Sequence, residues 1–356
     1  MQEIVQNLFS VKNENNQKKI KILGLKLSFI LLKKYKYIIY RRYVYPIIRN
    51  DLFHNALNKR NFINYIFLYN KRLLKLRKKI YWDIALFKFL LRCKLDIPVI
   101  DFNITTMCTL RCEQCGSLMP FYPKNNQWTI PFDEFKNDLD KLLSFVNIIH
   151  RLKLIVGEPL LVKDLDKMLE YAANKKQIKT VEITTNGTIM FSENLLNLLT
   201  KYRKKVLVVI SNYSSNKELK CFKYDDIKLA LEIRQIPYTF PSHPWYLRGK
   251  IYKRNRTIKD LKYVFKKCWQ RDCIALMEGK MHHCTRSIAI QRLSNYEFLP
   301  DEFIDIRKNS LRKNINNLRR FYLKDYFRVC DFCITPNTQR IPRAMQTAEL
   351  QKIGDK

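Results

Sequence analysis

The sequence of 356 residues has no long hydrophobic run. The longest uncharged apolar stretch near the N-terminus spans residues 27–32, between two lysines, whereas a membrane-spanning helix needs ~20 mostly apolar residues. The opening MQEIVQNLFS also lacks the basic segment, apolar segment and small-residue cleavage site of a secretory signal. We therefore expect a cytoplasmic protein without a membrane span.

Acidic residues are scarce: 32 Asp and Glu stand against 67 Lys and Arg, a net charge of +35. The excess is uneven, because residues 1–100 carry 22 basic and 5 acidic side chains, whereas residues 101–200 carry 11 and 12. This shift predicts a domain boundary near residue 97. Hydrophobic residues make up 47% of the chain, which is enough to bury a core and excludes a wholly disordered protein.

Residues 1–96 are predicted to be a basic, aromatic-rich N-terminal extension, partly helical. The segment 20–30 alternates around a glycine as in a short hairpin, and residues 63–95 place apolar side chains at helical spacing between Lys and Arg. Such helices either pack on the main domain or dock on an anionic membrane surface at the inner membrane face, where each basic residue adds ~1 kcal/mol. No recognisable nucleic-acid module accompanies the charge, so no specific nucleic-acid partner is expected.

From residue 98 onward strands alternate with helices, which predicts an α/β fold with a parallel sheet or barrel. The expected strands are 99–105, 148–156, 180–185, 206–210 and 238–240, and the expected helices are 131–145, 165–173, 193–200 and 225–234. The site of such a fold lies at the carboxyl ends of the strands. Polar, Gly and Pro residues follow four of the strands, at Cys108, Gly157, Asn186 and Ser211, so we expect these to share one rim.

The βα pattern stops at about residue 245. Beyond it, residues 274–283 predict a hairpin that turns at Glu278-Gly279. Residues 311–321 predict a helix, and the tail 334–356 shows little pattern.

The ten cysteines are clustered, which in a cytoplasmic chain is more typical of metal ligands than of disulfides. Three lie within eight residues, and five more lie between 268 and 333. Cys93 and Cys221 stand alone and are expected to be buried as small apolar residues.

The first cluster has the spacing Cys108-x3-Cys112-x2-Cys115. Three thiolates on one short loop can ligate three irons of a cubane [4Fe–4S] cluster and leave the fourth iron without a protein ligand. An open iron binds a small chelating ligand, as an open position on catalytic zinc does. A structural zinc site would need a fourth ligand nearby, and no Cys or His lies between Cys115 and His150.

This loop and the strand IDFNITTMC before it resemble the radical S-adenosylmethionine superfamily, and the resemblance extends over roughly residues 98–345. Gly157-Glu158-Pro159 resembles the Gly-Gly-Glu-Pro element of that superfamily, and residues 184–187 and 211–212 resemble its later strand-end contacts. The resemblance implies a partial (β/α)6 barrel over 97–245. It also implies a [4Fe–4S] cluster on Cys108, Cys112 and Cys115, with S-adenosyl-L-methionine as second cofactor.

The resemblance also implies roles for the residues at the strand ends. Gly157 and Glu158 would bind the cofactor, with Glu158 accepting a hydrogen bond from its ammonium group. Thr185, Asn186 and Ser211 would hold its ribose and carboxylate. The reduced cluster would then cleave the sulfonium, and the 5′-deoxyadenosyl radical would abstract a hydrogen atom from the substrate. Two residues depart from the pattern: Gln114 replaces an aromatic residue, and Val156 replaces the first glycine.

The second set of cysteines resembles the shortened SPASM extension (twitch), a small C-terminal cluster-binding domain over 246–356. The resemblance implies one auxiliary [4Fe–4S] cluster on Cys268, Cys284, Cys330 and Cys333, with Cys273 as an alternate ligand or a nearby thiol. Four cysteines suit structural zinc equally well. His282 and His283 flank this set, and we expect them beside the site rather than as ligands.

Three functions remain open at this point. The first is radical oxidation or epimerisation of a lipid- or nucleotide-linked sugar, with an auxiliary cluster to accept an electron and the basic run 248–256 to bind a diphosphate. Trp245 and residues 341–346 resemble a branch encoded with bacterial surface-polysaccharide enzymes. The second is modification of a peptide, and the third is a cluster-carrying electron-transfer scaffold. An external electron donor such as a flavodoxin or ferredoxin is an expected partner.

Overall fold

The computed structural model describes residues 9–14, 17–22, 25–28, 38–50, 76, 79–80, 83–84, 88–89, 93–248, 251–334 and 339–347. The helices predicted over 63–95 lie largely outside these residues. Within them, no helix combines the length and the apolar composition that crossing a membrane requires.

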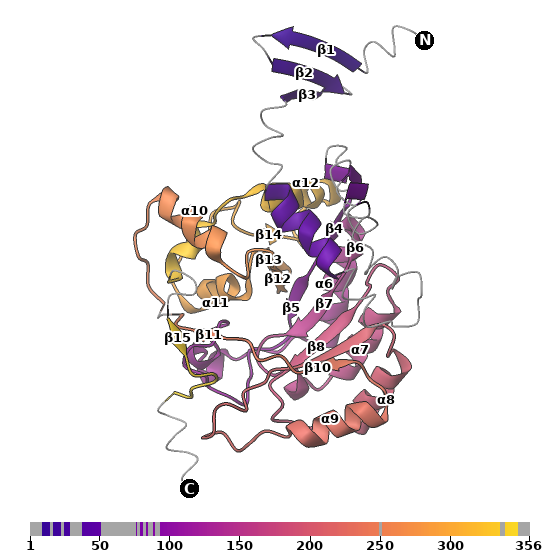
Figure 1. The fold of residues 1–356 in the computed structure, drawn as a ribbon, viewed down its shortest axis with the longest axis vertical. Coiled ribbons are helices and arrows are strands. Elements are labelled where there is room, and N and C mark those ends of the chain that lie inside the picture. Colours follow the sequence, from indigo (N-terminus) through magenta and orange to yellow (C-terminus); the bar gives the residue numbers. More distant parts are fainter. Residues whose placement is uncertain are drawn as a thin grey trace.

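The main sheet has eight strands in the order β10-β9-β8-β7-β5-β12-β13-β14 (Figure 1). They are β5 (Ile100–Asn103), β7 (Leu152–Ile155), β8 (Val181–Thr185), β9 (Val206–Ile210), β10 (Tyr238–Thr239), β12 (Ile274–Met277), β13 (Lys280–His282) and β14 (Ile304–Asp305). Neighbours from β10 to β12 are parallel, and β13 and β14 are antiparallel. The predicted α/β fold is confirmed, and the described strands form an open sheet.

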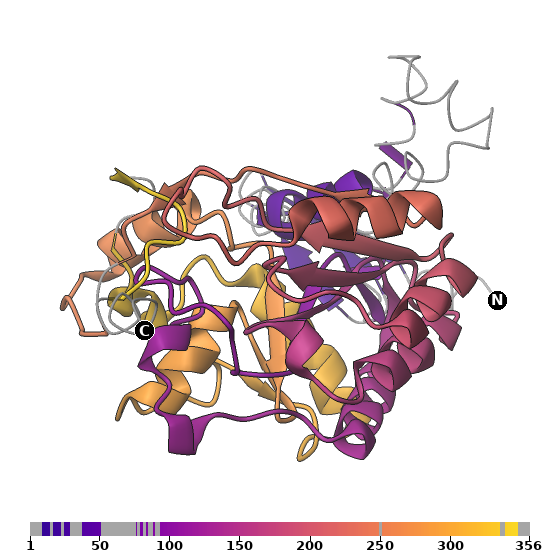
Figure 2. The same cartoon turned by 90° about the horizontal axis from the view of Figure 1, so that it is seen from below.

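Four helices cover one face of the parallel strands, as Figures 1 and 2 show. They are α6 (Phe132–Phe145), α7 (Leu165–Asn174), α8 (Glu193–Lys201) and α9 (Tyr224–Ile233), close to the predicted bounds. Side chains alternate across a strand, so Phe102 packs against Phe135 of α6 with ring centroids 4.7 Å apart. Asp101 and Asn103, its neighbours, therefore point to the opposite face, which we call the inner face.

One predicted strand is wrong in extent. Residues 148–156 do not form one strand but contribute to two, β6 (Val146–Ile149) and β7. β6 pairs with β4 (Leu95–Ile97), whereas β7 pairs with β5 and β8. The chain changes partner at His150, whose N–H donates to the Ile97 carbonyl over 2.9 Å.

The predicted hairpin is confirmed as β12–β13, with φ angles of 49° at Glu278 and 70° at Gly279. Two adjacent residues with positive φ are the requirement of a two-residue hairpin turn. β12 also pairs with β5, so the region predicted as a C-terminal domain continues the main sheet. The remaining elements of the region 245–341 are β11 (Trp245–Tyr246), α10 (Ile258–Lys267), α11 (Thr285–Leu293), α12 (Leu311–Leu323), η5 (Arg328–Phe332) and β15 (Arg340–Ile341).

The N-terminal region contains a separate antiparallel sheet of β1 (Phe9–Glu14), β2 (Gln17–Ile22) and β3 (Leu25–Ser28). The pairing of Ile22 with Leu25 confirms the predicted hairpin. A helix over 38–50, π-helical over η1 (Tyr40–Val44), packs on the C-terminal region. Buried Arg42 holds it there, because its Nη1 donates to the carbonyls of Phe321 and Lys324 over 2.6 and 2.8 Å.

Three short 3-10 turns complete the described elements: η2 (Met119–Phe121), η3 (Lys124–Asn126) and η4 (Pro159–Leu161). The first two follow the cysteine loop 108–115, and η4 follows Glu158 at the end of β7. They therefore belong to the loops at the carboxyl ends of the strands.

Candidate functional site: the strand-end rim and its cysteines

The carboxyl ends of β5, β7, β8 and β9 meet at one rim, as the sequence predicted. Hydrogen bonds join the four ends in series. The Glu158 N–H donates to the Met107 carbonyl over 2.8 Å, and the Asn186 N–H donates to Glu158 Oε2 over 2.8 Å. The Ser211 N–H then donates to the Thr185 carbonyl over 2.9 Å. Adjacent parallel strands thus place the predicted residues next to the cysteine loop.

The cysteine loop gathers three thiols. Burial raises the pKa of Cys108 to about 12, and it also raises the pKa of Cys112. The charge of Cys115 raises both pKa values further, so the three sulfurs lie within electrostatic range of one another. Buried thiolates need a compensating cation. The donor set therefore fits an iron–sulfur cluster, whose irons supply that charge.

The C-terminal tail holds this loop, which the sequence did not predict. The Glu113 N–H donates to the Met345 carbonyl over 2.7 Å, and the Thr347 N–H donates to the Arg111 carbonyl over 3.0 Å. The side chain of Gln346 accepts from the Arg111 N–H at 2.7 Å and donates to Cys112 Sγ at 3.4 Å. No local pattern marks this contact, because it joins residues more than 230 positions apart.

The turn after β7 passes very close to the cysteine loop. A Cβ on Gly157 would lie 2.1 Å from the Met107 carbonyl oxygen, and the φ of Gly157 is +64°. Only glycine fits there. Val156 has a φ of 81°, which is strained for a β-branched residue. This strain explains why glycine is the expected residue at that position.

Glu158 is fully buried at this turn. Its carboxylate accepts the N–H groups of Asn186 and Leu160, over 2.8 and 3.2 Å. Burial raises the pKa of Glu158, and these hydrogen bonds oppose the rise. In the structure Glu158 thus ties β7 to β8, and its contact with a cofactor ammonium group stays a prediction.

The other predicted cofactor residues lie along the same rim. Asn186 Nδ2 donates to Thr109 Oγ1 over 2.9 Å and lies 3.7 Å from Cys108 Sγ. The Thr185 hydroxyl accepts the Gly187 N–H over 3.1 Å. Ser211 presents its carbonyl to the Tyr224 hydroxyl, 2.9 Å away. These residues are brought together, and their contacts with a cofactor remain predictions.

Gln114 connects the cysteine loop to the segment after β11. Its Oε1 accepts the Arg248 N–H over 2.9 Å. The position that departs from the family pattern therefore has a structural partner in this chain.

Four of the five C-terminal cysteines form a second group. Cys268 ends α10, Cys284 precedes α11, and Cys330 and Cys333 lie on and just after η5. Burial raises the pKa of Cys330 well above its ordinary value, and the charges of the other three cysteines raise it further. These are the four cysteines that the sequence favoured as ligands, and their role as ligands stays a prediction.

His283 lies inside this second group. Its ring is buried, and its Nε2 is 3.4 Å from Cys284 Sγ and 3.5 Å from Cys330 Sγ. The ring also stacks on Phe327, with centroids 4.3 Å apart. His282 is buried as well, and its Nδ1 lies 3.0 Å from Ser287 Oγ. His283 thus lies among the cysteines, and the expectation that neither histidine is a ligand stays a prediction.

Cys273, the fifth C-terminal cysteine, lies just before β12. Burial raises its pKa to about 12, the charges of Asp101 and Cys268 raise it further, and Lys153 lowers it. Its neighbours therefore include side chains of the inner face. Cys93 and Cys221 are exposed, so the prediction that they are buried is wrong.

The spacing of thiols differs between a single-ion site and a cluster. Within the described part of the chain, no group of three or more His, Cys, Asp or Glu could hold a single metal ion. Four thiolates on one zinc lie only ~3.8 Å apart, because each Zn–S bond is ~2.3 Å long. The ligands of a cubane bind four separate irons and are spaced more widely.

The inner face carries a row of buried charges that the sequence did not predict. Asp101, Lys153 and Glu182 are in register on β5, β7 and β8. The Lys153 Nζ lies 3.5 Å from a carboxylate oxygen of each. Asn103 is 1% exposed, and its Oδ1 has no hydrogen-bond partner among the described residues. The sequence did contain a sign of this row, because polar residues occupy alternate positions of otherwise apolar strands.

The charges of this row shift its pKa values. Burial would raise the pKa of Glu182, but Lys153 and Arg151 lower it below its ordinary value. Burial raises the pKa of Asp101, and Lys153 opposes that rise. Two carboxylates therefore differ in basicity although they share one lysine.

Comparison with known proteins identifies the domain. The model of the Radical SAM superfamily matches residues 102–227. The antilisterial bacteriocin subtilosin biosynthesis protein AlbA of Bacillus subtilis is 31% identical over 121 residues, which cover 33% of this chain and 25% of AlbA. The GTP 3′,8-cyclase of Aquifex aeolicus is 29% identical over 127 residues, which cover 35% of this chain and 38% of the cyclase.

The chain thus spans between 25% and 38% of the length of these two relatives. Among solved structures, that of BtrN in complex with AdoMet and 2-DOIA is similar over 72% of this chain and 98% of BtrN, at 15% identity and a TM-score of 0.43. The matched residues 102–227 run from β5 to α9 and include the loop of Cys108, Cys112 and Cys115. Residues 102–227 thus match the radical S-adenosylmethionine superfamily, whose members bind a [4Fe–4S] cluster and S-adenosylmethionine.

Proposed function

We propose that this radical SAM enzyme oxidises or epimerises a small polyhydroxylated substrate, a nucleotide- or lipid-linked sugar of a surface glycan. The observation that carries the proposal is the charged row on the inner face of the strands that end at the rim. The bound cluster and S-adenosylmethionine supply a 5′-deoxyadenosyl radical for hydrogen abstraction. The residues of this chain bind and orient the substrate and accept its proton.

Buried polar groups normally have hydrogen-bond partners, and the inner face offers polar groups that a substrate could bind. Among the described residues Asn103 Oδ1 has no partner, and Asp101 Oδ1 has only the ion pair with Lys153. Sugar hydroxyls are donors of suitable size. We infer that Asp101 and Asn103 bind substrate hydroxyls and that Lys153 fixes the carboxylate of Asp101.

Oxidation of a carbinol removes a hydrogen atom, a proton and an electron. Asp101 is suited to accept the proton, because burial raises its pKa. The group of Cys268, Cys284, Cys330 and Cys333 supplies an electron acceptor when it holds an auxiliary [4Fe–4S] cluster. Epimerisation instead needs a hydrogen donor, and the thiol of Cys273 beside Asp101 is available for that role.

Arg248 supports an anionic substrate. Its guanidinium is mostly buried, and burial lowers its pKa, while the charges of Cys268, Cys333 and Cys115 oppose the change. It therefore lies within range of both cysteine groups. Another member of the predicted diphosphate-binding run, Arg256, is already engaged, because it donates to the Cys333 carbonyl over 2.6 Å.

The test uses sugar nucleotides and lipid-linked sugars deuterated at ring carbons, with anaerobically reconstituted enzyme. We expect deuterium to appear in 5′-deoxyadenosine. Conversion of the substrate carbinol to a carbonyl indicates oxidation, and uptake of solvent deuterium at an inverted carbon indicates epimerisation. D101N and N103L should lose at least ~100-fold in this transfer, while substrate-independent formation of 5′-deoxyadenosine persists. Absence of stimulation by every sugar tested would refute the proposal.

A second candidate function is modification of a peptide. The similarity to AlbA favours it, although that match is confined to about a third of this chain. Binding of a short precursor peptide, with deuterium transfer from the peptide, would establish it. An electron-transfer scaffold, the third hypothesis, predicts no 5′-deoxyadenosine at all.

A further inference from the structure

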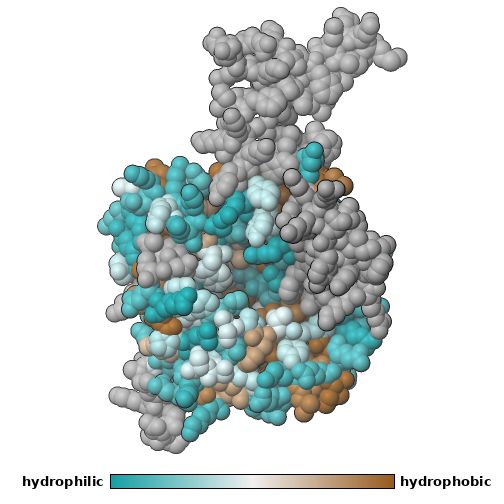
Figure 3. Space-filling model, in the orientation of Figure 1, coloured by the Kyte–Doolittle hydropathy of each residue, from teal (hydrophilic) through white to brown (hydrophobic). Residues whose placement is uncertain are grey.

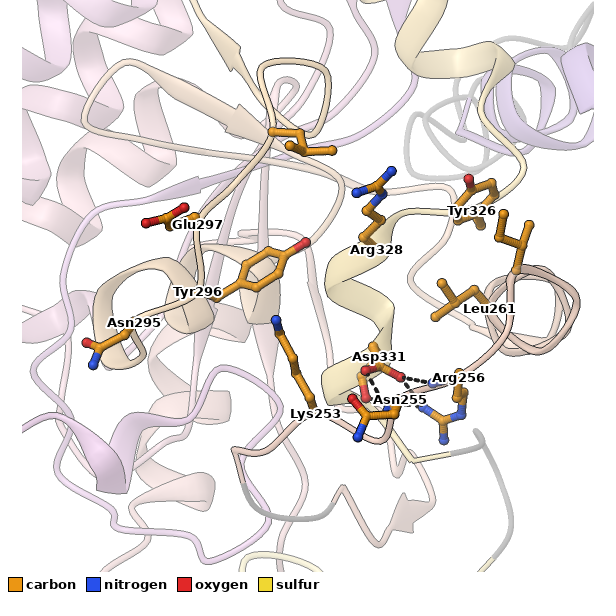
Figure 4. Close-up of a pocket in the computed structure, with 12 residues that line it drawn as sticks. Lys253, Asn255, Arg256, Leu261, Asn295, Tyr296, Glu297, Tyr326, Arg328 and Asp331 are labelled. Carbon is orange, nitrogen blue, oxygen red and sulfur yellow. Dashed lines mark hydrogen bonds and ion pairs between the residues drawn. The ribbon is translucent and has the colours of Figure 1, made fainter.

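A pocket of about 610 Å³ opens on the outer side of the second cysteine group. Its walls come from segments 253–261, 295–299 and 326–331 (Figure 4). Arg328 and Asp331 belong to η5, the turn that carries Cys330. The pocket is therefore separated from the cysteine sulfurs by that single turn.

Two contacts connect the pocket to the cysteines directly. Arg256 Nη1 donates to the Cys333 carbonyl over 2.6 Å. Tyr296 packs edge-on against Phe332, with centroids 5.3 Å apart. Burial and the hydrogen bond to Glu302 raise the pKa of Tyr296, and the charge of Cys330 adds a smaller rise. A molecule seated in the pocket would thus lie next to the second cysteine group.

The pocket is lined by three cations, Lys253, Arg256 and Arg328, and by two carboxylates, Glu297 and Asp331. Asp331 is already satisfied, because it accepts the N–H groups of Arg254, Asn255 and Arg256 over 2.9 to 3.1 Å. In the part of the chain that the structure describes, neither Lys253 nor Arg328 pairs with a carboxylate. The Lys253 Nζ lies 5.1 Å from the centre of the Tyr296 ring, and Figure 4 shows both cations around that ring.

The segments around the pocket carry more basic than acidic residues. Residues 251–271 contain eight Lys and Arg and one acidic residue, Asp260, whereas residues 295–302 contain three acidic residues and no Lys or Arg. The first of these segments includes α10, whose side chains belong to the mostly hydrophilic surface around this helix in Figure 3. An excess of charge of one sign around a pocket raises the association rate of an oppositely charged partner.

We propose that this basic pocket is the docking site of a small acidic electron-carrier protein, which exchanges one electron with the auxiliary cluster. The inference rests on the proposed auxiliary cluster. In each encounter the reduced carrier loses one electron and the oxidised cluster gains it, or the reverse, and no bond forms or breaks. Arg256 is already bound to backbone carbonyls, so the two remaining cations and the basic segment 251–271 suit an acidic protein surface better than a single phosphate group.

The test uses a full-length variant in which the second cysteine group holds the only cluster. The variant C108A/C112A/C115A removes the first cluster, and about four irons per chain should remain. In this background, the rate of reduction by flavodoxin hydroquinone is measured from the bleaching of the cluster absorbance in an anaerobic stopped-flow instrument. K253E/R328E should be reduced at least ~10-fold more slowly at low ionic strength, and its rate should depend less on salt.

Two controls separate docking from damage. K163E/K204E reverses two exposed lysines that do not line the pocket and should keep the rate of the background. Photoreduced 5-deazaflavin needs no docking site, so the rate at which it reduces the cluster should be equal in all variants.

Each alternative result has a distinct meaning. Equal flavodoxin rates in K253E/R328E and its background, with the cluster intact, would overturn the docking site and leave the auxiliary cluster standing. Binding of pyrophosphate that requires Lys253 and Arg328, with an unchanged carrier rate, would overturn it in favour of a phosphate site. Absence of iron from the triple variant would refute the auxiliary cluster and the docking site together.

Discussion

The Nε2 of Gln346 lies 3.4 Å from the sulfur of Cys112 and donates to it. This contact joins the C-terminal tail to the middle cysteine of the first loop. A donor to a ligand sulfur stabilises the more negative, reduced cluster and raises its potential. A hydrogen bond of ~1 kcal/mol corresponds to roughly 40 mV for one electron.

We therefore expect Q346L to lower the midpoint potential of the first cluster by tens of millivolts. An EPR-monitored redox titration measures it, and S-adenosylmethionine should be absent so that the cluster alone is observed. E113Q, on the same loop, is the control. A potential that does not move in Q346L would show that the contact only positions the tail.

Gly157→Ala should prevent correct assembly of the first cluster. The added Cβ would lie 2.1 Å from the Met107 carbonyl oxygen, at a φ of +64°, so the turn must move away from Cys108. Gly116→Ala is a matched control in the same loop region, since a Cβ there meets nothing within 4 Å. Iron and sulfide analysis should show about four fewer irons per chain in G157A only. Normal iron content in G157A would contradict the importance of this close approach between the two loops.

Lys153→Met should destabilise the fold most at neutral pH. Removal of one partner of a buried ion pair costs about 3–5 kcal/mol. In the native protein the pKa of Glu182 is lowered. Ionised Glu182 therefore stabilises the fold at pH values above the ordinary pKa of a carboxyl group, and this stabilisation is lost as the pH falls through the pKa of Glu182 in the folded protein. In K153M, Asp101 and Glu182 lose a cation, and protonation at lower pH relieves the cost.

The loss of unfolding free energy in K153M, relative to the native protein, should therefore be larger at about pH 7.5 than at about pH 5. Urea unfolding of both proteins at each pH measures it. K204M, at an exposed lysine, should show no deficit at either pH. A deficit independent of pH would mean that lost packing, rather than charge, is responsible.

Asp138→Ala should loosen the attachment of the β12–β13 turn to α6. Asp138 is 1% exposed and accepts Arg307 Nε and Nη2 over 2.6 and 2.7 Å, and the Gly279 N–H over 2.9 Å. Loss of this buried acceptor should cost about 2–4 kcal/mol.

Asp140→Ala on the same helix is the control for this prediction. Asp140 pairs with Lys175 at the surface, and such pairs contribute only ~0–1 kcal/mol. Thermal unfolding should separate the two variants clearly. Equal melting temperatures would contradict the importance of the buried acceptor.

We also propose that the N-terminal extension contacts an anionic membrane surface. Leu76, Ile80 and Ile84 are 52%, 48% and 50% exposed, and their spacing of four residues places them on one side of a helix. The protein should sediment with phosphatidylserine vesicles and much less with phosphatidylcholine vesicles. I80E/I84E should lose this binding, and unchanged sedimentation would refute the contact.

The chain itself determined the first cluster loop and the order of strands and helices. The spacing of Cys108, Cys112 and Cys115 is local, because a few residues of chain limit how far apart three thiols can lie. The alternation of the strands and the polar residues after them likewise follow from local patterns. These patterns placed Glu158, Asn186 and Ser211 at one rim, since parallel neighbours end at the same edge.

Tertiary structure alone decided the surroundings of the C-terminal cysteines. Packing brings Cys268 within electrostatic range of Cys330, and Cys273 within range of Asp101 and Cys268, and the choice of Cys268 as ligand stays a prediction. Packing also divided the basic run, with Arg248 near both cysteine groups and Lys253 at the outer pocket. The contact of Gln346 with Cys112 spans 234 positions, and only packing of the whole chain brings such distant residues together.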